Sequence, residues 1–74
     1  MNEKMNQEKA VLRHLRTNNY ITSMIAFDLY GITRLSSIIH RLRKQGYNIE
    51  TKMVYTTNRF GYTVGYANYY LKEN

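Results

Sequence analysis

The chain has 74 residues, and its 11 Lys and Arg against 5 Asp and Glu give a formal net charge of +6 at pH 7. A chain this short holds one modest hydrophobic core, so we expect a single domain over residues 1–74 without a deep catalytic cleft. It contains no Cys, which excludes disulfides and thiolate-bound zinc.

The first residues and the apolar runs of the chain indicate neither a secretory nor a membrane segment. Residues 1–9 carry charges of both signs and lack the apolar region of a signal peptide. No apolar run approaches the roughly 18 residues that a membrane-spanning helix requires. We therefore expect a cytoplasmic protein without a membrane partner, and we expect residues 1–5 to be disordered.

The excess of positive charge favours a polyanionic partner, which includes nucleic acid, an acidic membrane surface and an acidic protein. The charge is concentrated, because residues 33–48 contain no carboxylate. Their basic residues are Arg34, Arg41, Arg43 and Lys44.

The first predicted helix spans residues 6–17. Val11, Leu12 and Leu15 fall on one helical stripe, which we expect to face the core. The residues expected to face elsewhere are Lys9, Arg13, His14 and Arg16. The pair Asn18-Asn19 supplies a left-handed stop.

The second predicted helix spans residues 23–30, with the Thr22 hydroxyl as its N-cap. Gly31 suits the left-handed position that ends such a helix, and Ile32 supplies the accompanying hydrophobic contact. The apolar set of this helix is Met24, Ala26, Phe27, Leu29 and Tyr30.

The third predicted helix spans residues 34–45, follows the turn at Gly31 directly, and has Thr33 as its N-cap. This order of helix, tight turn and helix is typical of a helix-turn-helix. The apolar face consists of Leu35, Ile39 and Leu42, flanked by Ile38. The opposite face carries Ser37, His40, Arg41 and Lys44, with Arg34 at its edge.

A two-stranded hairpin is predicted after Gly46, because residues 47–57 and 62–71 are rich in Tyr, Val, Ile and Thr. Asn58-Arg59-Phe60-Gly61 is the expected four-residue loop between these strands. The predicted fold class is therefore α+β, with three helices followed by a hairpin.

Three runs of residues make the chain resemble the small winged helix-turn-helix DNA-binding proteins of phages and prophages. These runs are Tyr20-Ile21-Thr22-Ser23, Tyr30-Gly31-Ile32-Thr33-Arg34-Leu35, and Leu42-Arg43-Lys44-Gln45-Gly46-Tyr47-Asn48-Ile49. The likeness extends from about Val11 to Leu71. It implies that the third helix enters the DNA major groove, that the hairpin is the wing, and that the host cell is bacterial or phage-infected.

Two positions depart from the family pattern. Ile25 stands where a Glu would complete a capping box with Thr22, and Ile38 stands where a polar or basic residue is common. These two side chains either widen the core or form a contact surface for a partner.

The third helix supplies most of the expected DNA contacts. In a helix-turn-helix the second helix of the motif reads base edges with its first and outward residues. Our base-reading candidates are Arg34, Ser37 and Arg41, because Arg grips guanine with two hydrogen bonds and Ser permits close approach. The further candidates on and beside this helix are Thr33, Ser36, His40, Arg43 and Lys44. For Arg43 and Lys44, an interaction with the helix dipole is an equal alternative.

The hairpin supplies the remaining candidates. Arg59 at the tip is expected to reach the minor groove or the backbone, and Lys52 to meet a phosphate. For Asn58 we favour a role in the turn over a DNA contact. The tyrosines of the hairpin suit a small core or a dimer interface better than stacking on unpaired bases. They are Tyr55, Tyr62, Tyr66, Tyr69 and Tyr70.

The catalytic inventory is poor, so we expect neither an enzyme nor a cofactor or metal site. Asp28 and Glu50 are isolated carboxylates, and His14 and His40 lie in no ligand motif. Gly61 and Gly65 form no phosphate-binding fingerprint.

Sequence-specific binding of double-stranded DNA is the leading functional hypothesis, as a repressor, activator or excision factor that acts as a homodimer or in several copies. One alternative is a phage-encoded inhibitor that binds a host protein, such as a nucleic-acid enzyme or a defence complex. A second alternative is an architectural DNA or RNA binder with little sequence preference.

Overall fold

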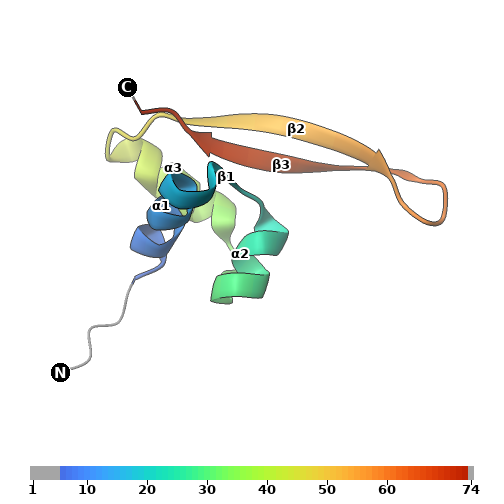
Figure 1. Cartoon of the computed structure of the whole chain (residues 1–74), viewed down its shortest axis with the longest axis horizontal. Coiled ribbons are helices and arrows are strands. Elements are labelled where there is room, and N and C mark those ends of the chain that lie inside the picture. Colours follow the sequence, from blue (N-terminus) through green and yellow to red (C-terminus); the bar gives the residue numbers. More distant parts are fainter. Residues whose placement is uncertain (1–5, 74) are drawn as a thin grey trace.

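The computed structural model describes residues 6–73, so the expected disorder of residues 1–5 lies outside the described residues. Over the described range, three helices and a short strand precede a long hairpin (Figure 1). The elements are α1 Gln7–Asn18, β1 Tyr20–Ile21, α2 Ser23–Tyr30, α3 Leu35–Lys44, β2 Ile49–Thr57 and β3 Thr63–Leu71. The predicted α+β order of three helices followed by a hairpin is confirmed.

Local side-chain and backbone signals set the ends of the first two helices. The Asn6 side chain accepts a hydrogen bond from the backbone N–H of Lys9, and Asn19 ends α1 in the left-handed conformation at φ 74°. Thr22 caps α2 as predicted, because its hydroxyl accepts from the N–H of Ile25 at 3.2 Å. Gly31 ends α2 at φ 67°, a conformation that disfavours residues with a Cβ.

The start of α3 differs from the prediction. The helix begins at Leu35, and its N-cap is Arg34 rather than Thr33, with no capping hydrogen bond from a side chain. Arg34 has φ −124° and ψ 61°, which is not helical, so the regular helix starts one residue later than expected. The first N–H groups of α3 are consequently not covered by a side-chain cap.

The hairpin belongs to a three-stranded antiparallel sheet of order β1-β3-β2. β2 pairs with β3 from Ile49↔Leu71 to Thr57↔Thr63, and the two residues of β1 pair with Tyr70 and Tyr69. β1 was not predicted from the sequence, because its two residues are too few to show a period. Both strands of the hairpin begin later than predicted, at residues 49 and 63.

The hairpin loop runs from Asn58 to Tyr62, one residue longer than expected. The Asn58 side-chain oxygen accepts hydrogen bonds from the N–H groups of Phe60 at 3.0 Å and Tyr62 at 3.1 Å. This bonding confirms the turn role favoured for Asn58.

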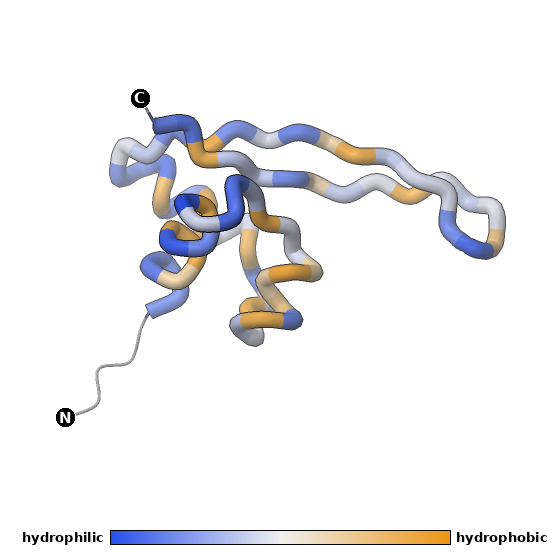
Figure 2. Tube along the Cα trace, viewed as in Figure 1, coloured by the Kyte–Doolittle hydropathy of each residue, from blue (hydrophilic) through white to orange (hydrophobic). Residues whose placement is uncertain are grey.

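The hydrophobic core lies where the helices meet each other and the base of the sheet (Figure 2). Ile38 is one of its members, so this departure from the family pattern widens the core and forms no outer contact surface. Ile25 packs against the core and is half-buried. The buried members are Val11, Leu15, Ile21, Ala26, Ile32, Leu35, Ile38, Ile39, Leu42 and Ile49.

The expectation about the burial of His14 is wrong. His14 was expected to face away from the core, but it is only 6% exposed, and its Nδ1 is hydrogen-bonded to the Tyr30 hydroxyl at 2.8 Å.

In the apolar set of α2, only Ala26 is buried. The eight-residue helix is apolar on most of its sides but packs on the core along one of them. Its exposed members are Met24, Phe27, Leu29 and Tyr30.

The hairpin projects well past the helices and makes the molecule elongated, with extents of 49 × 31 × 20 Å (Figure 1). Ile49 at its base is buried, whereas Met53 and Tyr55 farther along β2 are exposed. The far half of the hairpin is therefore a two-stranded arm that no other element of residues 6–73 covers. Among the described residues, no helix is long and apolar enough to cross a membrane.

Candidate nucleic-acid interface

The third helix divides into a buried face and a basic face. Leu35, Ile38, Ile39 and Leu42 anchor it in the core. Every other residue from Thr33 to Lys44 is exposed. The exposed candidates on and beside α3 are Thr33, Arg34, Ser36, Ser37, His40, Arg41, Arg43 and Lys44.

Four of these residues follow one another along the exposed side of the helix. Ser37, Arg41 and Lys44 are spaced at i, i+4 and i+7 on α3, so they lie within one narrow stripe, and Arg34 precedes them at the N-cap. We call these four residues the α3 stripe. His40 adjoins it, while Ser36 and Arg43 lie toward the other edge of the exposed surface.

The charge of the α3 stripe is uncompensated within residues 6–73. The ion pairs in that part of the chain are Arg16–Glu73, at 2.9 Å, and Lys72–Glu50, at 2.7 Å. None of these residues belongs to α3. The stripe therefore presents three cations to solvent.

The two paired carboxyl groups are themselves held in the ionised form. A hydrogen bond from Arg16 lowers the pKa of Glu73, and a hydrogen bond from Lys72 lowers the pKa of Glu50. Near neutral pH both carboxylates are charged, and each is paired with its own cation, Arg16 or Lys72. Neither carboxylate is therefore a partner for the cations of α3.

The exposed Arg43 side chain makes two hydrogen bonds within the protein. Its Nε donates to the backbone carbonyl of Ile49 at 2.9 Å, and its terminal nitrogen donates to the Thr51 hydroxyl at 2.7 Å. The guanidinium therefore ties the end of α3 to the first residues of β2. These two acceptors were not predicted from the sequence, because they lie on β2, beyond the turn that ends the helix.

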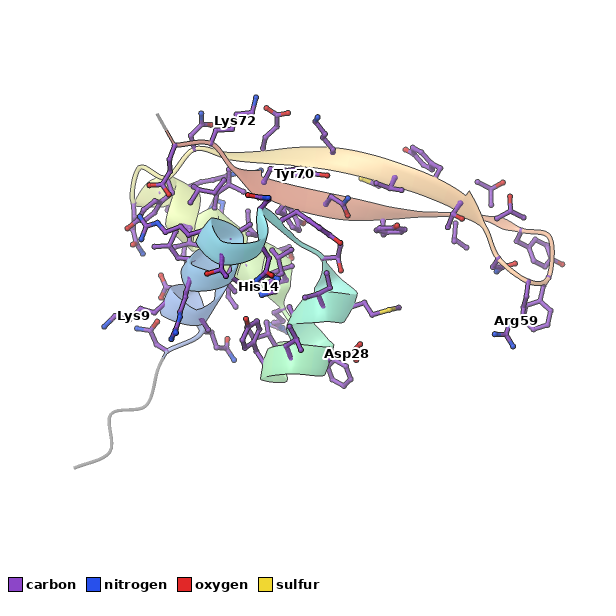
Figure 3. All side chains as sticks on the ribbon, in the orientation of Figure 1. Lys9, His14, Asp28, Arg59, Tyr70 and Lys72 are labelled. Atoms are coloured by element: carbon purple, nitrogen blue, oxygen red, sulfur yellow. The ribbon has the colours of Figure 1, made fainter. Side chains whose placement is uncertain are left out.

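The candidate residues of the hairpin differ in how free their side chains are to contact DNA. Lys52 Nζ lies 5.5 Å from the centre of the Tyr70 ring, a cation–π arrangement on the sheet. Asn58 is half-buried and bonded within its turn. Arg59 is exposed at the far end of the hairpin (Figure 3). DNA contacts by these residues stay predictions.

The tyrosines of the hairpin do not form one group. Tyr69 packs against the core, and Tyr70 stacks at a tilt on Tyr20 of β1 with ring centres 6.0 Å apart. Tyr55, Tyr62 and Tyr66 are exposed. The expected core role is confirmed for Tyr69, while the outer three rings lie on the uncovered half of the hairpin.

A shallow pocket between α1 and α2 is a feature that the sequence did not reveal. Its lining includes the buried His14 and Tyr30, whose rings meet edge to face. The full lining is Ala10, Arg13, His14, Thr17, Asn18 and Tyr30. Within the described part of the chain, no three His, Cys, Asp or Glu residues are grouped to hold a metal ion.

The comparison with protein families matches the model of a winged helix-turn-helix domain to residues 6–74. The matched range includes all three helices, the α3 stripe and both strands of the hairpin. The comparison with curated proteins finds no match.

Proposed function

The chain belongs to the winged helix-turn-helix domain family, and from this we propose that it binds double-stranded DNA sequence-specifically through α3. Domains of this family are typically DNA-binding and non-enzymatic. The observation that carries the proposal is the α3 stripe, which presents Arg34, Arg41 and Lys44 without a carboxylate partner among the described residues.

The stripe matches the chemistry of the major groove. The groove is wide enough for an α-helix, and Arg contacts guanine O6 and N7 with two parallel hydrogen bonds. Arg34, at the start of α3, and Arg41, two turns farther along, are proposed to read bases on either side of the short Ser37 side chain.

Phosphate contacts are proposed for Lys44 of the stripe and for residues around the stripe. The first N–H groups of α3 have no side-chain cap, and the positive end of a helix favours an anion. The proposed phosphate contacts are Thr33, Ser36, His40 and Lys44. Such contacts supply most of the affinity and make it fall steeply with salt concentration.

The biological role that we propose is transcriptional regulation or excision in a phage or prophage. The support is the resemblance carried by the run from Tyr30 to Leu35. One domain of this size buries little DNA surface, so specific binding is proposed to use more than one copy.

Inhibition of a host protein is the second candidate function. Exposed apolar side chains on α2 and the hairpin favour it, among them Phe27 and Tyr55. Ile38 no longer supports it, because that side chain is buried.

Selection from a random duplex library at about 150 mM salt tests the DNA-binding proposal. The wild type is compared with the Arg34→Ala, Arg41→Ala double variant and with a control double variant, Lys9→Ala, Arg13→Ala, which loses the same charge from α1. We expect the wild type and the control to enrich one motif that the α3 variant loses. Absence of a motif with the wild type, or the same motif with the α3 variant, would contradict base reading by α3.

A further inference from the structure

The far half of the hairpin has the composition of a protein-binding surface. From Met53 to Ala67, Arg59 is the only charged residue. Large side chains are exposed along this segment, and no described helix or third strand covers it (Figure 1). They are Met53, Tyr55, Phe60, Tyr62, Val64 and Tyr66. A surface that tracks phosphates needs several cations, whereas Tyr, Phe, Met and Arg are enriched at protein interfaces.

A two-stranded arm is also stabilised when a partner covers one of its faces. Isolated hairpins are marginally stable in water, because each strand has only one neighbour and no face is packed. Here Phe60 at the tip is 77% exposed. We define the wing-tip patch as Arg59, Phe60 and Tyr62.

The second helix presents a surface of matching character. Met24 is 75% exposed and Phe27 is 58% exposed, and with Asp28 they occupy the i, i+3 and i+4 positions of one helix face. We define the α2 patch as Met24, Phe27 and Asp28. The buried Ala26 marks the core side of the helix, so the α2 patch lies on the solvent side.

The charges of the two patches are opposite and isolated. Asp28 is the only charged residue from Thr17 to Thr33, as Arg59 is in its own segment. Neither forms an ion pair within residues 6–73. Each patch therefore combines two exposed large apolar side chains with one uncompensated charge.

The two patches do not meet within one chain. Figure 3 shows Asp28 beside α2 and Arg59 at the far tip of the hairpin, well apart on two separate projections of the molecule. Two copies of the chain can bring them together, because each copy carries one patch of each kind.

We propose that the wing-tip patch of one copy docks on the α2 patch of a second copy and that the exchange is reciprocal. Arg59 of each chain then faces Asp28 of the other, and Phe60 and Tyr62 cover Met24 and Phe27. Reciprocal contact closes a two-fold dimer and uses every patch once. Apolar burial supplies the attraction, and the ion pair sets the register.

This assembly does not depend on DNA binding. It assigns Arg59 to a protein contact in the free protein, and it leaves the α3 stripe outside the interface. The proposal is therefore tested without nucleic acid, and a failed library selection would not affect it.

The test is sedimentation velocity of the purified chain over a range of concentrations, with the single variants Arg59→Asp and Asp28→Arg and the double variant that combines them. We expect the wild type to reach twice the chain mass of 8.9 kDa. Each single reversal places like charges opposite one another, so the dimer dissociation constant rises about tenfold or more. The double variant restores opposite charges and recovers dimerisation.

Lys9→Asp is the control, because it reverses an exposed charge of α1 that belongs to neither patch. Circular dichroism and the urea midpoint establish that each variant is folded. A wild type that stays monomeric, single reversals that dimerise like the wild type, or a double variant without recovery would each overturn the proposal. Open oligomers that grow with concentration would overturn the reciprocal geometry, and a complex formed only with another protein would replace the second copy as the partner.

Discussion

Arg41 and Arg43 show how two identical side chains, two positions apart on one helix, take different roles. Arg43 lies on the edge of α3 that faces β2, where its guanidinium donates to the Ile49 carbonyl and the Thr51 hydroxyl. Arg41 lies in the α3 stripe and has no ion pair within residues 6–73. The position around the helix axis therefore separates a structural arginine from a candidate base reader.

Replacement of Arg43 by Ala is expected to lower the free energy of unfolding by about 1–3 kcal/mol, because two charge-assisted hydrogen bonds are lost. Arg41→Ala is the matched control and is expected to change it by no more than about 0.5 kcal/mol. Urea denaturation followed by circular dichroism measures both. Equal midpoints for the two variants would show that the Arg43 contacts do not stabilise the fold.

At the scale of the element, α2 depends on its ends more than on its faces. The helix has eight residues and buries only Ala26. Isolated helices of this length are unstable in water. Two local signals define its limits, the Thr22 hydroxyl that accepts from Ile25 and the left-handed Gly31 whose N–H donates to the Phe27 carbonyl at 2.9 Å.

Thr22→Ala is expected to destabilise the protein by about 1 kcal/mol, because the N–H of Ile25 loses its acceptor. Thr22→Ser keeps the hydroxyl and should retain most of that stability. Hydrogen exchange of the α2 amides, measured beside the urea midpoint, locates the effect. Faster exchange in Thr22→Ser than in Thr22→Ala would contradict the capping role.

At the scale of the whole molecule, Glu73 near the C-terminus contacts the first helix. Arg16 of α1 binds Glu73 through two hydrogen bonds, at 2.9 and 3.3 Å, and β1 pairs with β3. Lys72 binds Glu50 of β2. Both acids have a folded-state pKa below the ordinary value of 4.5, so the folded protein holds their protons less tightly than the unfolded chain does.

These pKa shifts predict a dependence of stability on pH. The contribution of the two ion pairs is present above the ordinary carboxyl pKa and is lost as the pH falls through the lowered folded-state values. The Glu50→Gln, Glu73→Gln double variant should therefore lose less stability than the wild type between pH 6 and pH 3. The effect should be small and should shrink in high salt, because both pairs are exposed. Urea midpoints at these pH values measure it, and parallel losses in both proteins would contradict it.

Structural features that depend on residues close together in the sequence were predictable. The apolar spacing of Leu35, Ile39 and Leu42 indicated which side of α3 is buried and, by exclusion, which residues form the exposed candidate site. Thr22, Gly31 and Asn58 act on neighbours within about one helical turn, so their roles followed from residue type and position.

Tertiary structure alone decided the features that depend on residues far apart in the chain. His14 is buried and its ring is hydrogen-bonded to Tyr30 of another helix, and β1 exists because β3 offers a pairing edge. Arg43 donates to an acceptor beyond the turn that leads into β2. Most of α2 is exposed, because only its Ala26 side is buried in the core. By itself, the sequence determined the order of the three helices and the hairpin and the basic character of α3, since helical periodicity and capping act locally. Which exposed surfaces stay uncovered was decided by packing, because burial depends on what the rest of the fold brings near.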